Sequence, residues 1–335
     1  MYFQDGVLSC ESMQPVRRCR VLPEISVVVP THDRRRLLAQ TLRSILWQRE
    51  VDFEVIVVDD GSSDGTAEAV AGLGEARVRL LRHETPRGVA AARNRGIAEA
   101  TGAWLAFCDD DDLWAPDKLA RQLQAARATG RSWVYTGEVR IDLRQRIVGG
   151  THPPPPPEQV ATRLPHWNLV PGGCSGVIAS KAALALAGWF DTRLRNLADW
   201  DLWIRLGRTG LPARVPGLLV GYRLHGGSAS RATTSIIAEA DMLDQRDGVA
   251  VDRGDLEHYL AVLCLRSGRH RDALRHLAAA ARHGKAAAAG RGLAWIAQER
   301  LPPPLLHALR QQQGRHDRWR AEAQAWLGQL PVDGC

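Results

Sequence analysis

Residues 103–112 read AWLAFCDDDD, an apolar run that ends in four consecutive aspartates. The apolar part predicts a buried strand, so the aspartates follow its carboxyl end. Neighbouring carboxylates repel one another strongly at the rim of a low-dielectric core, unless some hold a proton or a hard divalent cation neutralises them. The simpler alternative is a solvated acidic turn before a helix that starts near Pro116. The run by itself leaves both interpretations open.

Two upstream strands end in polar residues in the same way. Residues 54–58, EVIVV, lead into Asp59, Asp60 and a turn rich in helix-capping residues, and residues 25–30 lead into the sequence THD. Helical patterns at residues 37–45 and 88–100 separate the strands. Alternating strands and helices predict a parallel sheet whose ligand lies beyond the carboxyl ends of the strands, where all these acidic residues fall.

Four segments, in this order and at these spacings, resemble the family 2 glycosyltransferases of the GT-A fold. They read VVVPTHDRRRLLAQTLRSIL, VIVVDDGSSDGT, RGVAAARNRGIAEATGAWLAFCDDDDLWAPDKL and ADWDLWIRL, and the resemblance covers residues 23 to 230. It implies an α/β, Rossmann-like GT-A fold with a mostly parallel sheet flanked by helices. It also implies a metal-dependent, inverting hexosyltransferase (EC 2.4) that uses a nucleotide-diphosphate sugar, with a UDP-sugar the expected donor.

The resemblance assigns donor and metal roles to individual residues. The acidic run matches the DxD motif, which in the family holds Mg²⁺ or Mn²⁺ against the leaving diphosphate. Asp111 is then the expected direct metal ligand, Asp109 is directed toward the ribose or the water shell of the metal, Asp110 is the middle member, and His225 is a further candidate ligand. The other expected donor-binding residues are Pro30, Thr31, Asp33, Asp60 (toward the nucleobase), Arg93 and Asn94.

The segment NLADWDLW, residues 196–203, is the candidate catalytic element. In the family a carboxylate at this place removes the proton from the acceptor nucleophile. Asp199 matches that base, and Asp201 is the alternative, which otherwise reads as a charge at the start of a helix. The family usually has Glu where this chain has Ala198, so a contact on the acceptor side is missing.

Composition limits the class of protein. The chain of 335 residues carries a formal net charge of +7, but its basic residues are spread through Arg-rich helices and the expected pocket is acidic. This argues against nucleic acid as a substrate, while peripheral contact with an anionic membrane stays open. Six cysteines without a CxxC pair suggest reduced thiols and a cytoplasmic location. No apolar run is long enough for a membrane span or resembles a signal peptide.

The chain changes character after the catalytic segments. We expect a flexible N-terminal segment at residues 1–22, a GT-A catalytic domain at 23–232 and an α-helical region at 233–335. Residues 259–282 resemble a tetratricopeptide unit of two helices broken at Gly268, and the helices after Lys285 should complete a small bundle. Such a region suits acceptor selection or self-association, including a homodimer, and we expect it to contribute nothing to donor chemistry.

Five prolines at residues 153–157 predict a stiff, exposed connection that is neither helix nor central strand. The acceptor stays open among a glycan, a lipid-linked saccharide, a small molecule and a peptide. Two other functions also remain: a catalytically impaired nucleotide-sugar-binding module and a nucleotidyltransferase. The sequence PTHD lacks the glycines of a nucleotidyltransferase loop, and the acidic residues that an impaired module would lose are intact.

Overall fold

The computed structural model describes residues 22–150, 153–224, 233–299 and 318–330. Its strands are β1 (Ile25–Thr31), β2 (Phe53–Asp59), β3 (Val78–Arg82), β4 (Trp104–Phe107), β5 (Leu113–Trp114), β6 (Trp133–Ile141), β7 (Ile147–Gly150), β8 (Val177–Ser180) and β9 (Ala213–Arg223). Its first helices are α1 (Arg35–Leu46), α2 (Thr66–Ala71), α3 (Val89–Glu99), α4 (Lys118–Thr129), α5 (Pro157–Arg163), α6 (Lys181–Ala187) and α7 (Ala198–Thr209). The helices α8 (Thr233–Asp244), α9 (Arg253–Arg266), α10 (His270–Arg282), α11 (Ala286–Glu299) and α13 (Arg318–Leu327) follow.

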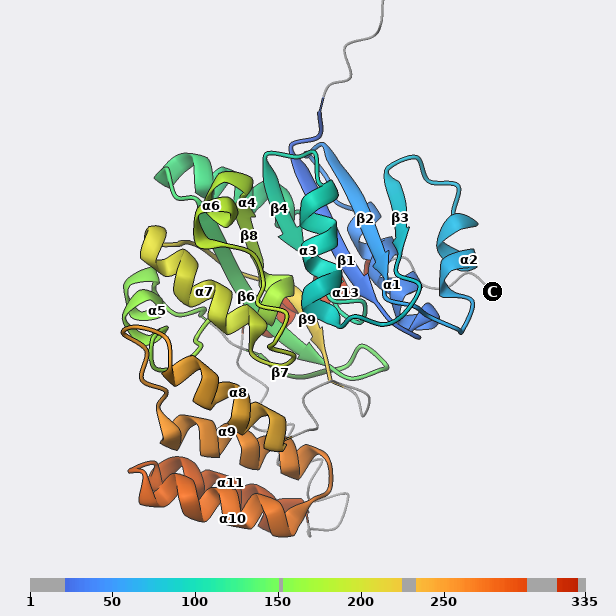
Figure 1. Ribbon diagram of the computed structural model, residues 1–335. Coiled ribbons are helices and arrows are strands. Elements are labelled where there is room, and N and C mark those ends of the chain that lie inside the picture. Colours follow the sequence, from blue (N-terminus) through green and yellow to red (C-terminus); the bar gives the residue numbers. More distant parts are fainter. Residues whose placement is uncertain (1–21, 151–152, 225–232, 300–317, 331–335) are drawn as a thin grey trace, which may run out of the picture.

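One mixed sheet organises the fold (Figure 1). Within the described residues its strands follow the order β3-β2-β1-β4-β8-β6-β9-β5, with β7 paired to β6. The pairs β3–β2, β2–β1, β1–β4 and β6–β9 are parallel, while β8 joins β4 and β6 antiparallel. The predicted mostly parallel α/β fold is therefore confirmed, and the three predicted strands are β1, β2 and β4.

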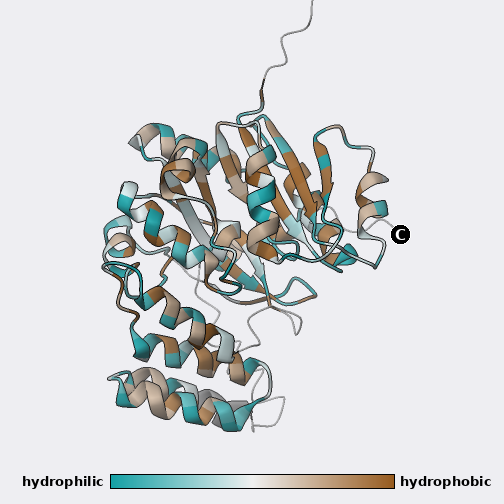
Figure 2. Cartoon of the chain, viewed as in Figure 1, coloured by the Kyte–Doolittle hydropathy of each residue, from teal (hydrophilic) through white to brown (hydrophobic). Residues whose placement is uncertain are grey.

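Both faces of the sheet are covered by helices, which explains why its strands read as continuous apolar runs. On β1, Val28 packs into the core on one face, and Val27 and Val29 pack into the core on the other. Figure 2 shows these central strands as hydrophobic, and the outer faces of the surrounding helices as mixed or hydrophilic. Gly96 lets α3 lie directly on β1, because a Cβ there would come within 2.3 Å of Val28 Cγ1.

The helical region does not stand apart from the catalytic domain. Ile236, Ala240 and Leu243 of α8 belong to the same core as the sheet and α7. Helices α9 and α10 confirm the predicted helix pair, and Gly268 between them has a positive φ of 69°. Figure 1 shows α8 to α11 stacked on one another at one side of the molecule.

The prediction that all helices after Lys285 complete this bundle is wrong for α13. Trp326 of α13 donates its indole N–H to the Leu218 carbonyl of β9 at 3.0 Å. Ala323, Trp326 and Leu327 pack into the core under the sheet, with the apolar residues of α1 and α4. The chain thus returns to the catalytic domain, because the apolar side chains of this short helix are buried against β9.

The proline segment also differs from expectation in part. Residues 151 and 152 lie outside the described residues, but Pro154 is buried and Pro157 is the first residue of α5. Pro at the first helical position is favourable, since its missing N–H would have no intrahelical partner. The segment is fastened by Tyr135, whose hydroxyl donates to the Pro155 carbonyl, and by Arg214, which donates to the Pro154 carbonyl at 3.0 Å.

No helix in the described part of the chain combines the length and the apolar character that crossing a membrane requires. The described cysteines Cys108, Cys174 and Cys264 are free and buried.

Candidate active site

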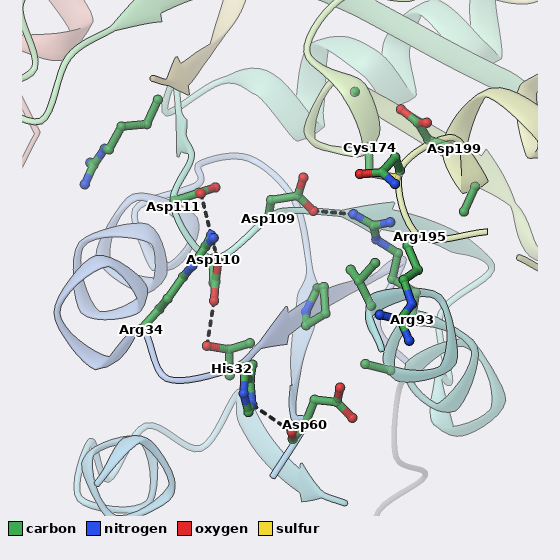
Figure 3. A pocket seen from close by; sticks show the side chains of 18 of the residues that line it. His32, Arg34, Asp60, Arg93, Asp109, Asp110, Asp111, Cys174, Arg195 and Asp199 are labelled. Carbon is green, nitrogen blue, oxygen red and sulfur yellow. Dashed lines mark hydrogen bonds and ion pairs between the residues drawn. The ribbon is translucent and has the colours of Figure 1, made fainter. Parts of the chain in front are cut away.

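A pocket of about 390 Å³ lies at the carboxyl ends of β1, β2 and β4 (Figure 3). The acidic residues that follow these strands meet in this pocket. Its lining includes Pro30, Thr31, His32, Arg34, Asp60, Arg93, Asp109, Asp110, Asp111, Gly173, Cys174, Arg195, Asn196, Asp199, Tyr222 and Tyr259. Eight of the residues expected from the sequence thus share one pocket: Pro30, Thr31, Asp60, Arg93, Asp109, Asp110, Asp111 and Asp199.

The middle of the acidic run is held by the loop after β1. Thr31 Oγ1 donates to Asp110 at 2.8 Å, and Arg34 Nη1 donates to Asp110 at 3.0 Å and to Asp111 at 2.6 Å. Burial raises the pKa of Asp110 to about 7, and the neighbouring charge of Asp111 acts in the same direction. The closely spaced carboxylates that the sequence predicted are therefore present in the pocket.

The last aspartate of the run is structural. Asp112 is fully buried and does not line the pocket. Its carboxylate accepts hydrogen bonds from Ser175 Oγ at 2.6 Å and from the Arg223 N–H at 2.9 Å. Ser175 Oγ also accepts from the Asp109 N–H at 3.0 Å. These bonds fix the turn that presents the preceding three aspartates.

Arg93 and Asp199 form the opposite wall from Arg34 (Figure 3). Arg93 Nη2 donates to Asp109 at 2.5 Å, and its guanidinium packs 5.3 Å from the Phe190 ring centre. Burial raises the pKa of Asp199 to about 6, although the nearby charge of Arg93 favours the ionised form. Gly173 brings the backbone next to Asp199 with a positive φ of 51°. The arrangement places a carboxylate that gains and loses its proton near neutral pH beside the acidic run.

Asp60 closes the far end of the pocket. Its carboxylate accepts from the N–H groups of Arg87 at 2.9 Å and Gly88 at 2.7 Å, and lies 2.6 Å from His83 Nδ1. Burial disfavours the ionised form, but these three hydrogen bonds outweigh it and lower the pKa of Asp60. The loop before α3 is therefore tied to the end of β2.

Three residues predicted for the site lie elsewhere. Asp33 accepts from the Ser63 N–H at 2.7 Å and joins two loops. Asn94 makes both of its amide bonds to the backbone of Phe190, at 2.8 and 2.9 Å. Asp201 is buried in ion pairs with Arg205 and Arg246, at 2.6 and 3.2 Å.

Each of these three has a hydrogen-bond or ion-pair partner outside the pocket, and none of them lines the pocket. The remaining candidate, His225, lies outside the described residues. Among the residues that are described, no group of three or more His, Cys, Asp or Glu side chains is arranged to hold a metal ion.

The pocket also has residues that the sequence did not single out. His32 and Arg34 follow β1, Arg195 precedes α7, and Tyr222 lies near the end of β9. Tyr259 comes from α9, so the helical region contributes a side chain to the pocket, unlike the separate role expected for it. The helical pattern around Tyr259 indicates a helix face, but no local pattern indicates which distant pocket that face meets.

Residues 26–182 match the protein family described as glycosyl transferase family 2. The chain is 33% identical over 183 residues to the UDP-Glc:alpha-D-GlcNAc-diphosphoundecaprenol beta-1,3-glucosyltransferase WfgD of Escherichia coli, which covers 54% of this chain and 69% of that relative. The chain belongs to glycosyl transferase family 2. This family 2 chain is also 30% identical over 197 residues to the putative glycosyltransferase EpsE of Bacillus subtilis, covering 56% and 68% of the two chains.

Solved structures agree with this family 2 assignment at the level of the fold. The mannosyltransferase PcManGT from Pyrobaculum calidifontis, in complex with GDP-Man and Mn²⁺, aligns with a TM-score of 0.54 and 20% identity over 92% of this chain and 86% of that one. S. aureus TarS 1-349 in complex with UDP-GlcNAc aligns with a TM-score of 0.55 and 16% identity, over 78% and 81%. The protein is therefore a glycosyltransferase with the GT-A fold, which sets the nucleotidyltransferase alternative aside.

Proposed function

We propose that this glycosyltransferase transfers a sugar from a nucleotide-diphosphate sugar, with UDP the nucleotide, to an acceptor hydroxyl with inversion at the anomeric carbon. The observation that carries the proposal is that Asp199 lines the same pocket as Asp109, Asp110 and Asp111. A leaving-group site and a base then face one reaction centre. The relative WfgD is named as a glucosyltransferase that uses UDP-Glc, which supports the choice of nucleotide.

The donor diphosphate would bind at the acidic run through a divalent metal, Mg²⁺ or Mn²⁺. Asp111 and Asp109 would hold the ion, because carboxylate oxygens are the ligands that these hard cations prefer. Two protein carboxylates completed by substrate phosphates and water are a common way to bind Mg²⁺, which accords with the absence of a larger ligand cluster among the described residues. The ion would stabilise the negative charge that develops on the leaving diphosphate.

Cationic side chains would share this task. Arg93 is tied to Asp109, and Arg195 lines the same wall of the pocket. Both would attract the diphosphate, since a guanidinium matches the geometry of phosphate oxygens. Asp60 would contact the nucleobase from the other end of the pocket, beside Pro30 and Thr31.

Asp199 would act as the general base. A base works best when its pKa is close to the working pH, and the pKa of Asp199 is raised to about 6 by burial. The ionised carboxylate would remove the proton of the acceptor hydroxyl as its oxygen attacks the anomeric carbon. Asp201 is not a competing base, because Arg205 and Arg246 hold it away from the pocket.

A hydrolysis assay tests the proposal without a known acceptor. The full chain is incubated with a panel of UDP- and GDP-sugars, with Mn²⁺ or with a chelator, and nucleoside diphosphate release is measured. We expect release from at least one UDP-sugar in the presence of Mn²⁺ and much less with the chelator. Equal release with the chelator would exclude the metal, and release from GDP-sugars alone would exclude UDP as the nucleotide. Asp199→Asn is the control variant, in which nucleoside diphosphate release that requires the base should be lost.

A further inference from the structure

The helix that carries Asp199 begins without a capping side chain of its own. The residue that precedes α7 is Leu197, where Ser, Thr, Asp or Asn is usually found. An apolar residue at this position cannot accept a hydrogen bond from the backbone, so the N–H groups at the entry to the helix need another partner. Asp199 itself is occupied locally, since its Oδ1 accepts from the Trp200 N–H at 2.7 Å.

Glu239 of α8, in the helical region, instead binds the two N–H groups just before the first turn, those of Asn196 and Leu197. Its Oε2 accepts from the N–H groups of Asn196 and Leu197, each at 2.8 Å. Its Oε1 accepts from the side-chain amide of Asn196 at 2.7 Å, and Ser235 Oγ accepts from the same amide at 3.0 Å. Glu239 is only 5% exposed, so one buried carboxylate holds three donors of the segment that leads into α7.

This segment is part of the pocket. Arg195, Asn196, Ala198 and Asp199 all line it. Hydrogen bonds to a buried, ionised acceptor are stronger than neutral ones, so they restrict the path of the backbone on which Asp199 sits. A second, independent contact joins the helical region to α7: Arg246, which follows α8, pairs with Asp201 at 3.2 Å.

We infer that Glu239 is a positioning residue for catalysis, through which the helical region fixes the Asn196–Asp199 segment and thereby the orientation of the Asp199 carboxylate; this rests on the proposed role of Asp199. The helical region then acts on the reaction itself. The effect of Glu239 falls mainly on turnover, because its hydrogen bonds end at Asn196 and Leu197, next to the helix that carries Asp199, and none of them reaches Arg195.

The variant Glu239→Gln tests the inference with little change in shape. An amide has one oxygen and an NH₂ group that cannot accept, so at least one of the three donors loses its partner. We expect amide hydrogen exchange in peptides covering residues 195–201 to become about ten- to hundredfold faster, the range for losing one charge-assisted bond. For hydrolysis of the UDP-sugar that is active in the panel, we expect kcat to fall about tenfold or more, with a much smaller change in KM and in the calorimetric Kd of UDP.

Asp241→Asn is the matched control. Asp241 is another carboxylate of α8, but it pairs with Arg253 at 2.8 Å, and within the described part of the chain it makes no hydrogen bond or ion pair with α7. Its neutralisation should leave both the exchange of residues 195–201 and kcat unchanged. Exchange is measured without substrate, so it decides the positioning claim even if no UDP-sugar proves to be a donor.

Four results would overturn the inference. Unchanged exchange in Glu239→Gln would show that the carboxylate does not hold the segment. Faster exchange with unchanged kcat would show that the segment does not orient the base. Equal effects of Asp241→Asn would show that any loss of charge on α8 disturbs the site. Should Glu239→Gln weaken UDP binding as much as it lowers kcat, the effect would be general loosening of the pocket, which also contradicts the inference.

Discussion

Asp199→Asn should lower activity and raise stability at the same time. A catalytic base that is buried and ionised is costly to the folded state, and burial raises the pKa of Asp199 from its ordinary 3.8 to about 6. The folded protein therefore binds the proton more tightly than the unfolded chain, and the ionised form destabilises the fold above about pH 6. Each unit of difference between the two pKa values corresponds to about 1.36 kcal/mol. Ionisation of Asp199 therefore lowers the free energy of unfolding by about 3 kcal/mol when it is complete.

The neutral asparagine removes this penalty while its Oδ1 can still accept from the Trp200 N–H. We expect the free energy of unfolding of Asp199→Asn to exceed that of the parent by up to about 3 kcal/mol at pH 7.5, with the difference shrinking as the pH falls from about 6 to 4. Urea denaturation at several pH values, without metal or nucleotide, measures it. In parallel, kcat for donor hydrolysis should fall about two to four orders of magnitude with little change in UDP affinity. A variant that is destabilised at pH 7.5, or whose stability gain persists unchanged at pH 4, would refute this account of Asp199.

Three further predictions follow from the same contacts. Asp111→Asn should remove most of the gain in UDP affinity that Mn²⁺ provides, measured by calorimetry; an undiminished gain would exclude Asp111 as a metal ligand. Asp201→Asn should lower the free energy of unfolding by about 1 to 3 kcal/mol, because it removes the buried carboxylate that pairs with Arg205 and Arg246, yet cost far less kcat than Asp199→Asn. The reverse order of kcat losses would mean that Asp201 is the base. A chain ending at Ala232 should lose both hydrolysis and transfer, since it lacks Glu239 and Tyr259, and retained hydrolysis in a folded truncated chain would contradict that.

The parts of this protein that the sequence predicted are those governed by local patterns. Strands β1, β2 and β4 are continuous apolar runs, and parallel strands place their carboxyl ends at one edge, so Asp60, Asp109 and Asp111 could be assigned to a common site before the structure was seen. The position of Asp199 depended on family resemblance, because no local rule brings residue 199 next to residue 109.

The structure differs from expectation where the partner of a polar side chain is distant in sequence. Asn94 and Asp33 have side chains suited to a ligand, but in this structure they bond to the backbone of Phe190 and of Ser63 and do not line the pocket. Burial of an apolar helix face could be predicted for α13, whereas its packing against β9 could not. Likewise no local pattern distinguishes Glu239 from the other acidic residues of α8, because its three donors belong to Asn196 and Leu197, 43 and 42 residues earlier in the chain.

The pH dependence of donor hydrolysis tests the central claim most directly, that Asp199 in its ionised form is the base of this glycosyltransferase. The measurement is kcat/KM for the active UDP-sugar from pH 4.5 to 8.5 at constant ionic strength and saturating Mn²⁺, because this ratio reports the ionisation of the free enzyme. The account predicts a rise with increasing pH that is half complete near pH 6, the raised pKa of Asp199, and that is absent in Asp199→Asn. A profile that is flat across this range, or that Asp199→Asn retains at full amplitude, would contradict it.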